Sequence, residues 1–174
     1  MKKNFIALAA VFTLLSLNAN AANIAVLDVE KIVKESVAMV DIQKKVTKKQ
    51  EEYQKEVNAK QKELEAEQKK LEGKKTVLAA DAFEKEMKKF EGKVDQLKEL
   101  VDKKQNSLKK ASVDAMGKVN DDIKTIIAEL SKEKSLDLIV PAGQTLFYKD
   151  EMDVSAEILK RLNKKVTKVN VNFE

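Results

Sequence analysis

The most regular feature of the sequence is a row of apolar residues between positions 82 and 130. Up to position 108 its members are separated by alternating steps of four and three residues: Phe83, Met87, Phe90, Val94, Leu97, Val101 and Leu108. The one gap is Lys104, which stands where an apolar residue is expected. Side chains at these steps share one face of an α-helix, and a pattern kept over several heptads predicts a coiled-coil seam.

A weaker row of apolar residues precedes it, from about position 40 to position 71. From Val57 onward it offers about one apolar residue per heptad, where a strong seam has two. The other residues are mostly Lys, Glu and Gln, which favour helix. The two stretches together predict an antiparallel helical hairpin, an arm formed by residues 41–130. We expect this arm to be about 60 Å long, slender and bendable.

Two local signals mark the ends of the expected arm. Gly73 predicts a helix stop, and Asp81 predicts an N-cap with Glu84 as its capping-box partner, so the tip is expected at about residues 73–82. The seam continues to Ala111 and Ala115, and Val119, Ile123, Ile126 and Leu130 then carry on the row, with successive steps of four from Ala111 to Ile123. Such a stutter unwinds a supercoil locally, and we expect the hairpin to enter a folded body there.

The residues before the arm predict one side of a small α+β body. The run from Ile24 to Val29 is apolar and rich in β-branched residues, which predicts a buried strand. A helix is expected to follow from Glu30 to Val40. Residues 22–40 therefore form the first part of the predicted body.

Residues 131–165, after the arm, predict the rest of the body. Two apolar runs at 136–140 and 145–149 are separated by four residues that include Pro141 and Gly143, which predicts a β-hairpin. A short amphipathic helix is expected after them, capped by either Asp153 or Ser155. For the C-terminal tail, residues 166–174, the alternation of apolar and polar residues leaves an added edge strand and a loose end both open.

The predicted body is small enough to need reinforcement. About 60 to 70 residues form a marginal core without disulfides or assembly. Its strands are almost continuously apolar, as if both faces were buried. Both features predict an oligomer whose subunits pool their strands into one core. The residues expected in that core are Ile24, Val26, Leu27, Leu138, Val140, Leu146 and Phe147.

Residues 1–21 have the pattern of a secretory signal peptide. Lys2 and Lys3 precede an apolar run at positions 5–17, and small residues follow at 19–21, so cleavage is expected between Ala21 and Ala22. The alternative is an uncleaved anchor, but a bilayer span takes about 20 apolar residues. The pattern predicts a soluble mature protein in the bacterial periplasm.

Composition narrows the possible chemistry. Cysteine and histidine are absent, which excludes disulfides and thiol or imidazole catalysis. Adjacent carboxylates such as Asp121 and Asp122 diverge on a helix, and Ser107 and Ser112 are expected on an exposed lysine-rich helix. We therefore expect no enzyme activity, no metal and no cofactor. Positive and negative charges are interleaved along the arm and aromatic residues make up 5% of the chain, so no nucleic-acid partner is expected.

The order of these features resembles the Skp (OmpH-like) periplasmic chaperones. The resemblance runs from Ile24 to about Lys164, and it is carried by the opening strand, the charged hairpin and the closing residues 136–140, Phe147-Tyr148, Asp153-Val154 and Ile158-Leu159. It implies a homotrimer whose three arms enclose a cavity for unfolded outer-membrane β-barrel proteins. The tail after Lys165 and the near absence of arginine depart from the family. Its lipopolysaccharide-binding residues have no clear match in this chain and are not carried over.

Apolar residues at the tip and lysines along the arm are the candidate binding residues. The tip group is Val77, Leu78, Phe83, Met87 and Phe90, which either contact clients or simply form the local seam. The lysine clusters are Lys44-Lys45-Lys48-Lys49, Lys74-Lys75 and Lys103-Lys104-Lys109-Lys110, which either attract acidic clients and anionic lipid or only keep the arm soluble. The leading hypothesis is an ATP-independent holdase, and the alternative is a structural periplasmic coiled-coil spacer or adhesin-like protein.

Overall fold

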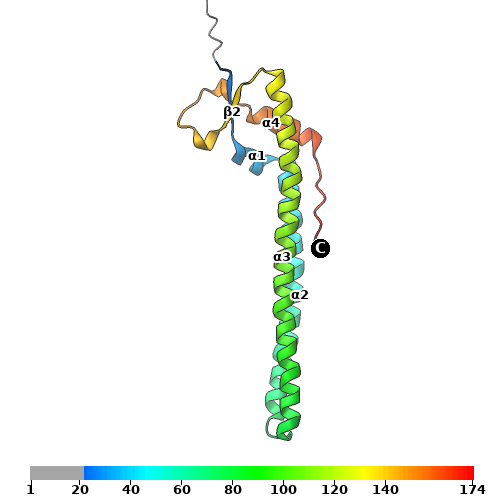
Figure 1. Cartoon of the computed structure of the whole chain (residues 1–174). Coiled ribbons are helices and arrows are strands. Elements are labelled where there is room, and N and C mark those ends of the chain that lie inside the picture. Colours follow the sequence, from blue (N-terminus) through cyan, green and yellow to red (C-terminus); the bar gives the residue numbers. More distant parts are fainter. Residues whose placement is uncertain (1–21) are drawn as a thin grey trace, which may run out of the picture.

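The computed structural model describes residues 22–174 and shows a small body with one long arm (Figure 1). The predicted signal peptide lies outside the described residues. The elements in chain order are β1 (Ile24–Leu27), α1 (Val29–Glu35), α2 (Val37–Lys74), α3 (Ala80–Glu133), β2 (Leu138–Pro141), two 3₁₀ turns (Ala142–Gln144 and Asp150–Met152) and α4 (Ser155–Lys165). The predicted α+β class with a helical hairpin is confirmed.

The arm consists of α2 and α3, of 38 and 54 residues, packed side by side in opposite directions (Figure 1). The predicted cap residues of the tip were wrong by one or two positions. Gly73 lies inside α2, which ends at Lys74, and the C-cap is Lys75, whose N–H donates to Glu72 O at 3.3 Å. Ala79 is the N-cap of α3, which places Asp81 in its first turn, where a carboxylate stabilises the positive end of the helix dipole.

The predicted continuous helix from Glu30 to Val40 is broken at Ser36. This residue is extended and buried, and its hydroxyl caps α2 by accepting a hydrogen bond from Met39 N at 3.1 Å. The Val37 N–H, one of the orphan donors at a helix start, donates to Asn163 Oδ1 of α4 at 2.8 Å. The break lets α1 and α2 take different directions, and Ala38, Met39 and Ile42 then face the core.

The predicted β-hairpin at 136–149 was wrong. β2 pairs in parallel with β1, with Ile24 opposite Leu138 and Leu27 opposite Pro141. Pro141 has no N–H to continue the ladder, and the chain turns into a 3₁₀ helix instead of a returning strand. The other side of β1 carries a single bridge, from Val26 to Asp153. Within residues 22–174 the sheet therefore has two strands, and 145–149 form part of a loop.

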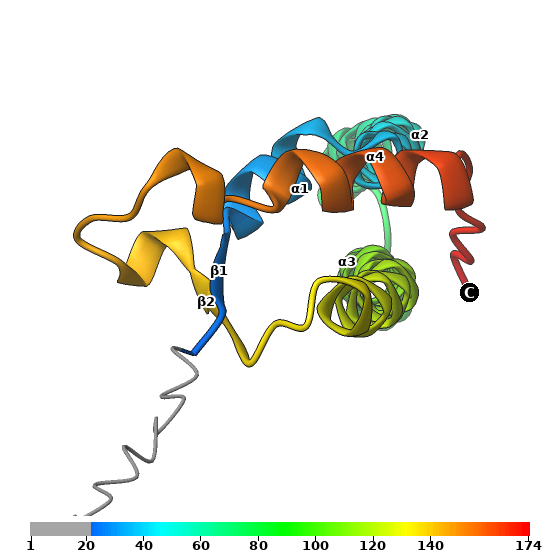
Figure 2. The same ribbon diagram turned by 90° about the horizontal axis from the view of Figure 1, so that it is seen from above.

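The core of the body lies between the sheet, α1, α4 and the near ends of α2 and α3. In the view from above, α4 lies across α1 and the end of α2 (Figure 2). Its Ile158 and Leu162 are fully buried together with Ile32, Ile42 and Leu130. The core also takes in α3 from Ala115 onward. The base of the arm is thus built into the body, which holds the hairpin firmly at one end.

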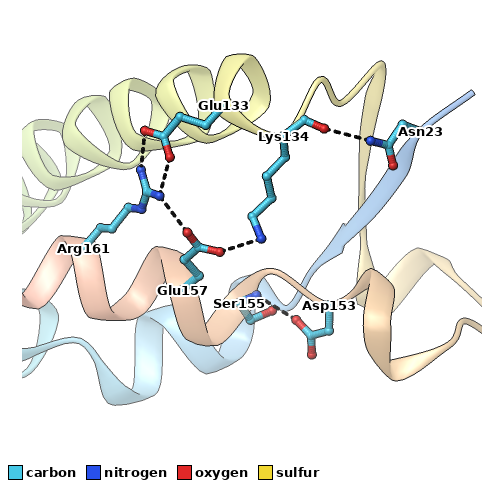
Figure 3. A network of polar contacts seen from close by, with 7 residues as sticks. All are labelled: Asn23, Glu133, Lys134, Asp153, Ser155, Glu157 and Arg161. Carbon is cyan, nitrogen blue, oxygen red and sulfur yellow. Dashed lines mark hydrogen bonds and ion pairs between the residues drawn. The ribbon is translucent and has the colours of Figure 1, made fainter.

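Charged side chains connect α3 to α4 beside the start of β1 (Figure 3). Arg161 donates two hydrogen bonds to Glu133, at 2.9 and 2.6 Å, and a third to Glu157 at 2.6 Å. Lys134 also pairs with Glu157 at 2.9 Å, while its backbone O accepts a hydrogen bond from Asn23. Pairing with Lys134 and Arg161 lowers the pKa of Glu157. The one arginine of the chain therefore holds the exit of α3 against α4.

The tail, residues 166–174, is neither an edge strand nor a loose end. It is extended and runs back along the arm from the end of α4 (Figure 1). Val169 is buried, and its backbone is hydrogen-bonded to side chains of α2. Apolar and polar residues alternate along the tail as predicted, but the tail packs on helix α2 and not on the edge of the sheet.

Candidate functional site

A groove with apolar walls lies near the tip of the arm, between α2 and α3. It has a volume of about 280 Å³ and is lined by Gln68, Leu71, Glu72, Lys75, Phe83, Met87 and Phe90. Leu71 is buried, whereas Phe83, Met87 and Phe90 are half-buried. These three side chains form the local seam and still leave part of their surface open, so the two interpretations of the tip residues are compatible. A methionine in such a groove adapts to partners of different shape.

The remaining two predicted tip residues lie in or next to the turn between the helices. Val77 is 80% exposed and does not line the groove. Leu78 is half-buried. The structure therefore brings together three of the five residues and leaves Val77 as a separate apolar side chain at the end of the arm.

A polar cluster fills the gap in the seam at Lys104. Its Nζ lies 4.0 Å from the centre of the Tyr53 ring, a cation–π contact, and 2.7 Å from Glu56 Oε2. Tyr53 Oη lies 3.5 Å from Ser107 Oγ. Ser107 is buried, so the expectation that it is exposed was wrong, because α2 covers this face of α3. The hydrogen bond from Lys104 lowers the pKa of Glu56.

Some lysines of the predicted clusters form ion pairs with acidic side chains of the same chain, and the others are exposed. Lys45 pairs with Asp41, Lys49 with Glu52, and Lys104 with Glu56. Farther along the arm, Lys93 ties α3 to Glu67 of α2 through two contacts of 2.6 and 2.7 Å. The lysines of the clusters that stay exposed are Lys44, Lys48, Lys74, Lys75, Lys103, Lys109 and Lys110. Sequence clusters alone do not separate these roles, since pairing depends on which helix face each lysine occupies.

The seven residues predicted for a shared oligomer core fall into two groups. Val26 and Leu27 are buried within one chain, so they offer no surface to another copy, and Ile24 and Val140 are half-buried. Leu138, Leu146 and Phe147 are exposed, Phe147 by 82%. The last two lie in the loop that replaced the predicted second strand of the hairpin. Further exposed apolar side chains follow along α1 and the start of α2: Val29, Val33, Val37 and Val40.

The adjacent carboxylates Asp121 and Asp122 form ion pairs with lysines of different helices. Asp121 pairs with Lys124, and Asp122 with Lys165 of α4, so the two adjacent carboxylates diverge as expected. Among residues 22–174 no group of acidic side chains is placed to hold a metal ion. In the same part of the chain, none of the helices combines the length and the apolar character that crossing a membrane requires.

Fold and surface together define a class of protein: a small α+β body that carries one long antiparallel helical arm with an apolar groove near its tip. The chain belongs to the outer membrane protein (OmpH-like) family, whose model matches residues 23–162. This confirms the resemblance that the sequence suggested. The tail after Lys165 lies outside the matched residues.

One solved structure shows the same architecture. It is described as a "putative outer membrane chaperone (OmpH-like)" from Caulobacter crescentus, and it superposes with a TM-score of 0.81 at 16% sequence identity. The match covers 88% of this chain and 91% of that chain. At this identity the match shows a shared fold. No curated protein sequence matches the chain.

Proposed function

We propose that this protein is an ATP-independent periplasmic holdase, which binds unfolded outer-membrane β-barrel proteins and prevents their aggregation before membrane insertion. The family and the description of the structural neighbour as a chaperone support the class. The observation that carries the proposal is the groove near the tip, where Phe83, Met87 and Phe90 pack only partly against α2. A long arm with a partly open apolar seam presents binding surface far from its own folded core.

Many weak contacts suit this function better than one tight site. An unfolded β-barrel strand offers short apolar segments, and each would gain only part of its burial energy on a half-open seam. Val77, exposed at the end of the arm, adds a further contact. Release then follows from the folding of the client itself, which removes those segments from the arm.

In this proposal the chain is exported with a signal peptide that is cleaved between Ala21 and Ala22. The functional unit is a homotrimer of the mature chain. Leu138, Leu146 and Phe147 leave an apolar surface on the body that a single chain does not cover. Three bodies that share this surface hold three arms around a cavity for the client. Exposed lysines such as Lys44 and Lys48 then attract acidic clients, or anionic lipid head groups, at long range.

The decisive experiment is analytical ultracentrifugation of residues 22–174. The mass is measured for this protein alone and again after a denatured outer-membrane β-barrel protein has been diluted into its solution. We expect a mass of three chains that gains one soluble client. Phe147→Ser should shift the mass toward one chain with an unchanged circular dichroism spectrum. A monomer from which the client precipitates contradicts the holdase and favours the structural spacer.

Two tip variants test where the client binds. Val77→Ser removes an exposed side chain from the turn, and Phe83→Ser opens the groove; both should lower client affinity several-fold. The matched control is Val40→Ser, which removes an exposed valine at the base of the arm. Equal effects of Val77→Ser and Val40→Ser on client affinity contradict a binding role for the tip.

A further inference from the structure

The tail is held against α2 through its backbone. Val169 N donates to Asp41 Oδ2 at 2.9 Å, and Val169 O accepts from Lys45 Nζ at 2.6 Å. Asp41 and Lys45 are one helical turn apart and pair with each other at 2.8 Å. Both polar groups of one extended residue are therefore satisfied, as they are by a neighbouring strand in a sheet. The hydrogen bonds from Lys45 and from Val169 N also lower the pKa of Asp41, because both donors stabilise its ionised form.

These contacts recognise an extended backbone rather than particular side chains. The tail side chains supply a second pattern, with a period of two. Val169 is 6% exposed and Val171 and Phe173 are half-buried, whereas Asn170 and Asn172 are exposed. Lys49 lies over the Phe173 ring at 6.0 Å from its centre. Apolar residues at every second position, in an extended segment, are also the signature of a transmembrane β-strand.

The surface beside the tail is a groove that the tail fills only in part. One open stretch of about 560 Å³ lies between α3 and the tail, lined by small residues such as Ala111 and Gly117 and by Asn170 and Asn172 of the tail. A second open stretch of about 700 Å³ follows around Glu174. Its positive lining residues are Lys103, Lys109 and Lys110. The tail residues that line the two stretches are the polar ones, so a segment bound in place of the tail has room for larger side chains at the positions that alternate with its apolar residues.

The groove is separate from the surface proposed for self-association. Both views place the tail on the side of the arm away from the loop at 142–152, which carries Leu146 and Phe147 (Figures 1 and 2). The groove is also distant from the tip, because Asp41 and Lys45 lie near the start of α2, at the body end of the arm. Releasing the tail should therefore change neither the oligomer nor the tip groove.

We propose that this groove, formed by Asp41, Lys45 and Lys49 of α2 and by α3 from Lys103 to Gly117, binds an extended segment with apolar residues at every second position, and that residues 166–174 occupy it as an internal competitor. The inference rests on the proposed function, since unfolded β-barrel proteins supply such segments. It assigns a second client site at the base of the arm, whose access the tail controls.

The first test uses the full chain and a labelled peptide with the sequence of residues 166–174. Val169→Ser should release the tail and leave the groove intact. A tethered segment acts at an effective concentration in the millimolar range, so release should strengthen peptide binding by about tenfold or more, measured by fluorescence anisotropy. Adding Asp41→Ala to Val169→Ser should abolish the gain. Phe173→Ser, farther from the core, should give a smaller gain and guards against misfolding of the first variant.

The matched control is a peptide of the same composition with Asn170 and Val171 exchanged, which breaks the alternation of apolar and polar residues. It should bind the Val169→Ser chain at least tenfold more weakly, because no register then places apolar residues at every second position on one face of the strand. Equal binding of the two peptides, or equal binding of the native peptide to wild type and Val169→Ser, overturns the groove as a strand site.

A client assay separates this inference from the proposed function. If wild type fails to keep a denatured β-barrel protein soluble, the holdase proposal fails whatever the peptide does. If wild type succeeds, Val169→Ser should hold the client several-fold more tightly, and the tail peptide should compete for that gain. Peptide binding with unchanged client affinity overturns the client site and leaves the tail as an internal strap.

Discussion

The two ends of the same helical hairpin are held together by different means. At the base, buried side chains recur on both helices: Ala38, Met39, Ile42, Ser107, Ala111, Ala115, Val119, Ile126 and Leu130. In the far part, residues 47–74 and 80–106, Leu71 is buried and every other side chain is exposed or half-buried. There the helices are joined by a narrow seam and by the pairs Lys104–Glu56 and Lys93–Glu67.

This contrast shows how one helical hairpin combines firmness with adaptability. Small residues such as Ala111 and Ala115 allow close approach at the base, and the body core adds large buried side chains. The far part has little buried apolar surface, so its local opening should cost the least free energy. The tip groove lies in the part that opens most easily, which suits the proposed binding of many different clients.

The largest expected effect comes from truncating the same residue type in the two parts. Leu130→Ala removes a fully buried side chain at the base and should lower the free energy of unfolding by about 2–5 kcal/mol. Leu97→Ala removes a half-buried side chain in the far part and should cost about 1 kcal/mol, since less apolar surface is lost. Urea denaturation followed by circular dichroism measures both. Equal losses would show that the far seam is as tightly packed as the base.

Filling the polar gap of the seam should have a smaller effect of opposite sign. Lys104→Leu replaces a charged side chain that is 17% exposed by an apolar one, and should stabilise the hairpin by about 1 kcal/mol after the lost cation–π contact is counted. A polar residue in a seam specifies register at a cost in stability. Hydrogen exchange of α2 and α3 should show slower opening of the far part. Faster exchange there would show that the Tyr53–Lys104–Glu56 cluster is stabilising.

Glycine replacements sharpen the comparison at a still smaller scale. Gly92 and Gly117 both lie inside α3, and a Cβ added at either meets open space. Each change to alanine should raise helix stability by about 0.5–1 kcal/mol. Gly92→Ala should slow hydrogen exchange in the far part and reduce client affinity, whereas Gly117→Ala should leave hydrogen exchange in the far part unchanged. Unchanged client affinity in Gly92→Ala, despite slower exchange, separates client binding from the stiffness of the arm.

The smallest expected effect is the pH dependence of the base. Arg161 lowers the pKa of Glu133, and Lys134 and Arg161 lower that of Glu157, below the ordinary value of 4.5. A carboxyl whose pKa is lower in the folded state stabilises the fold above its unfolded-state pKa, and loses this as pH falls through the folded-state value. The urea midpoint should therefore fall as pH drops below about 4.5.

Two substitutions test whether that pH dependence of stability arises from the carboxyl groups at the base. Glu157→Gln should flatten the fall of the midpoint, because an amide does not titrate. Glu91→Gln, at an exposed position of the far part, is the matched control and should keep the wild-type fall. Identical pH profiles for wild type and Glu157→Gln would show that other carboxyls govern acid stability.

The helices were largely predictable and the sheet was not. Alternating apolar steps report which face of a helix is covered, and they located the arm and its gap at Lys104. Leu146 and Phe147 have the composition of a strand, yet they lie in a loop because β1, more than a hundred residues earlier in the chain, pairs with β2 instead. The composition of a strand does not determine which other strand it pairs with, particularly when the two are separated by the long crossover that a parallel pair requires.

The candidate site was predictable in its residues and not in its geometry. Phe83, Met87 and Phe90 were found by spacing alone, but their groove depends on Leu71 from the opposite helix. Arg161 was evident as the one arginine of the chain, while its partners Glu133 and Glu157 emerge only when α4 packs against α3. Asp41 and Lys45 have the i,i+4 spacing of an ordinary helical ion pair, and that spacing does not show that the backbone of Val169 binds to both.

The sequence by itself determined the helical hairpin, its thin outbound seam, the small α+β body and the family to which the chain belongs. These follow from local periodicity, which acts between residues a few positions apart. The tertiary structure alone decided the break at Ser36, the parallel pairing of β1 with β2, and the docking of the tail on α2. Each of these satisfies backbone hydrogen-bonding groups with partners more than a hundred positions away, and such long-range pairing leaves no periodic signal in the chain.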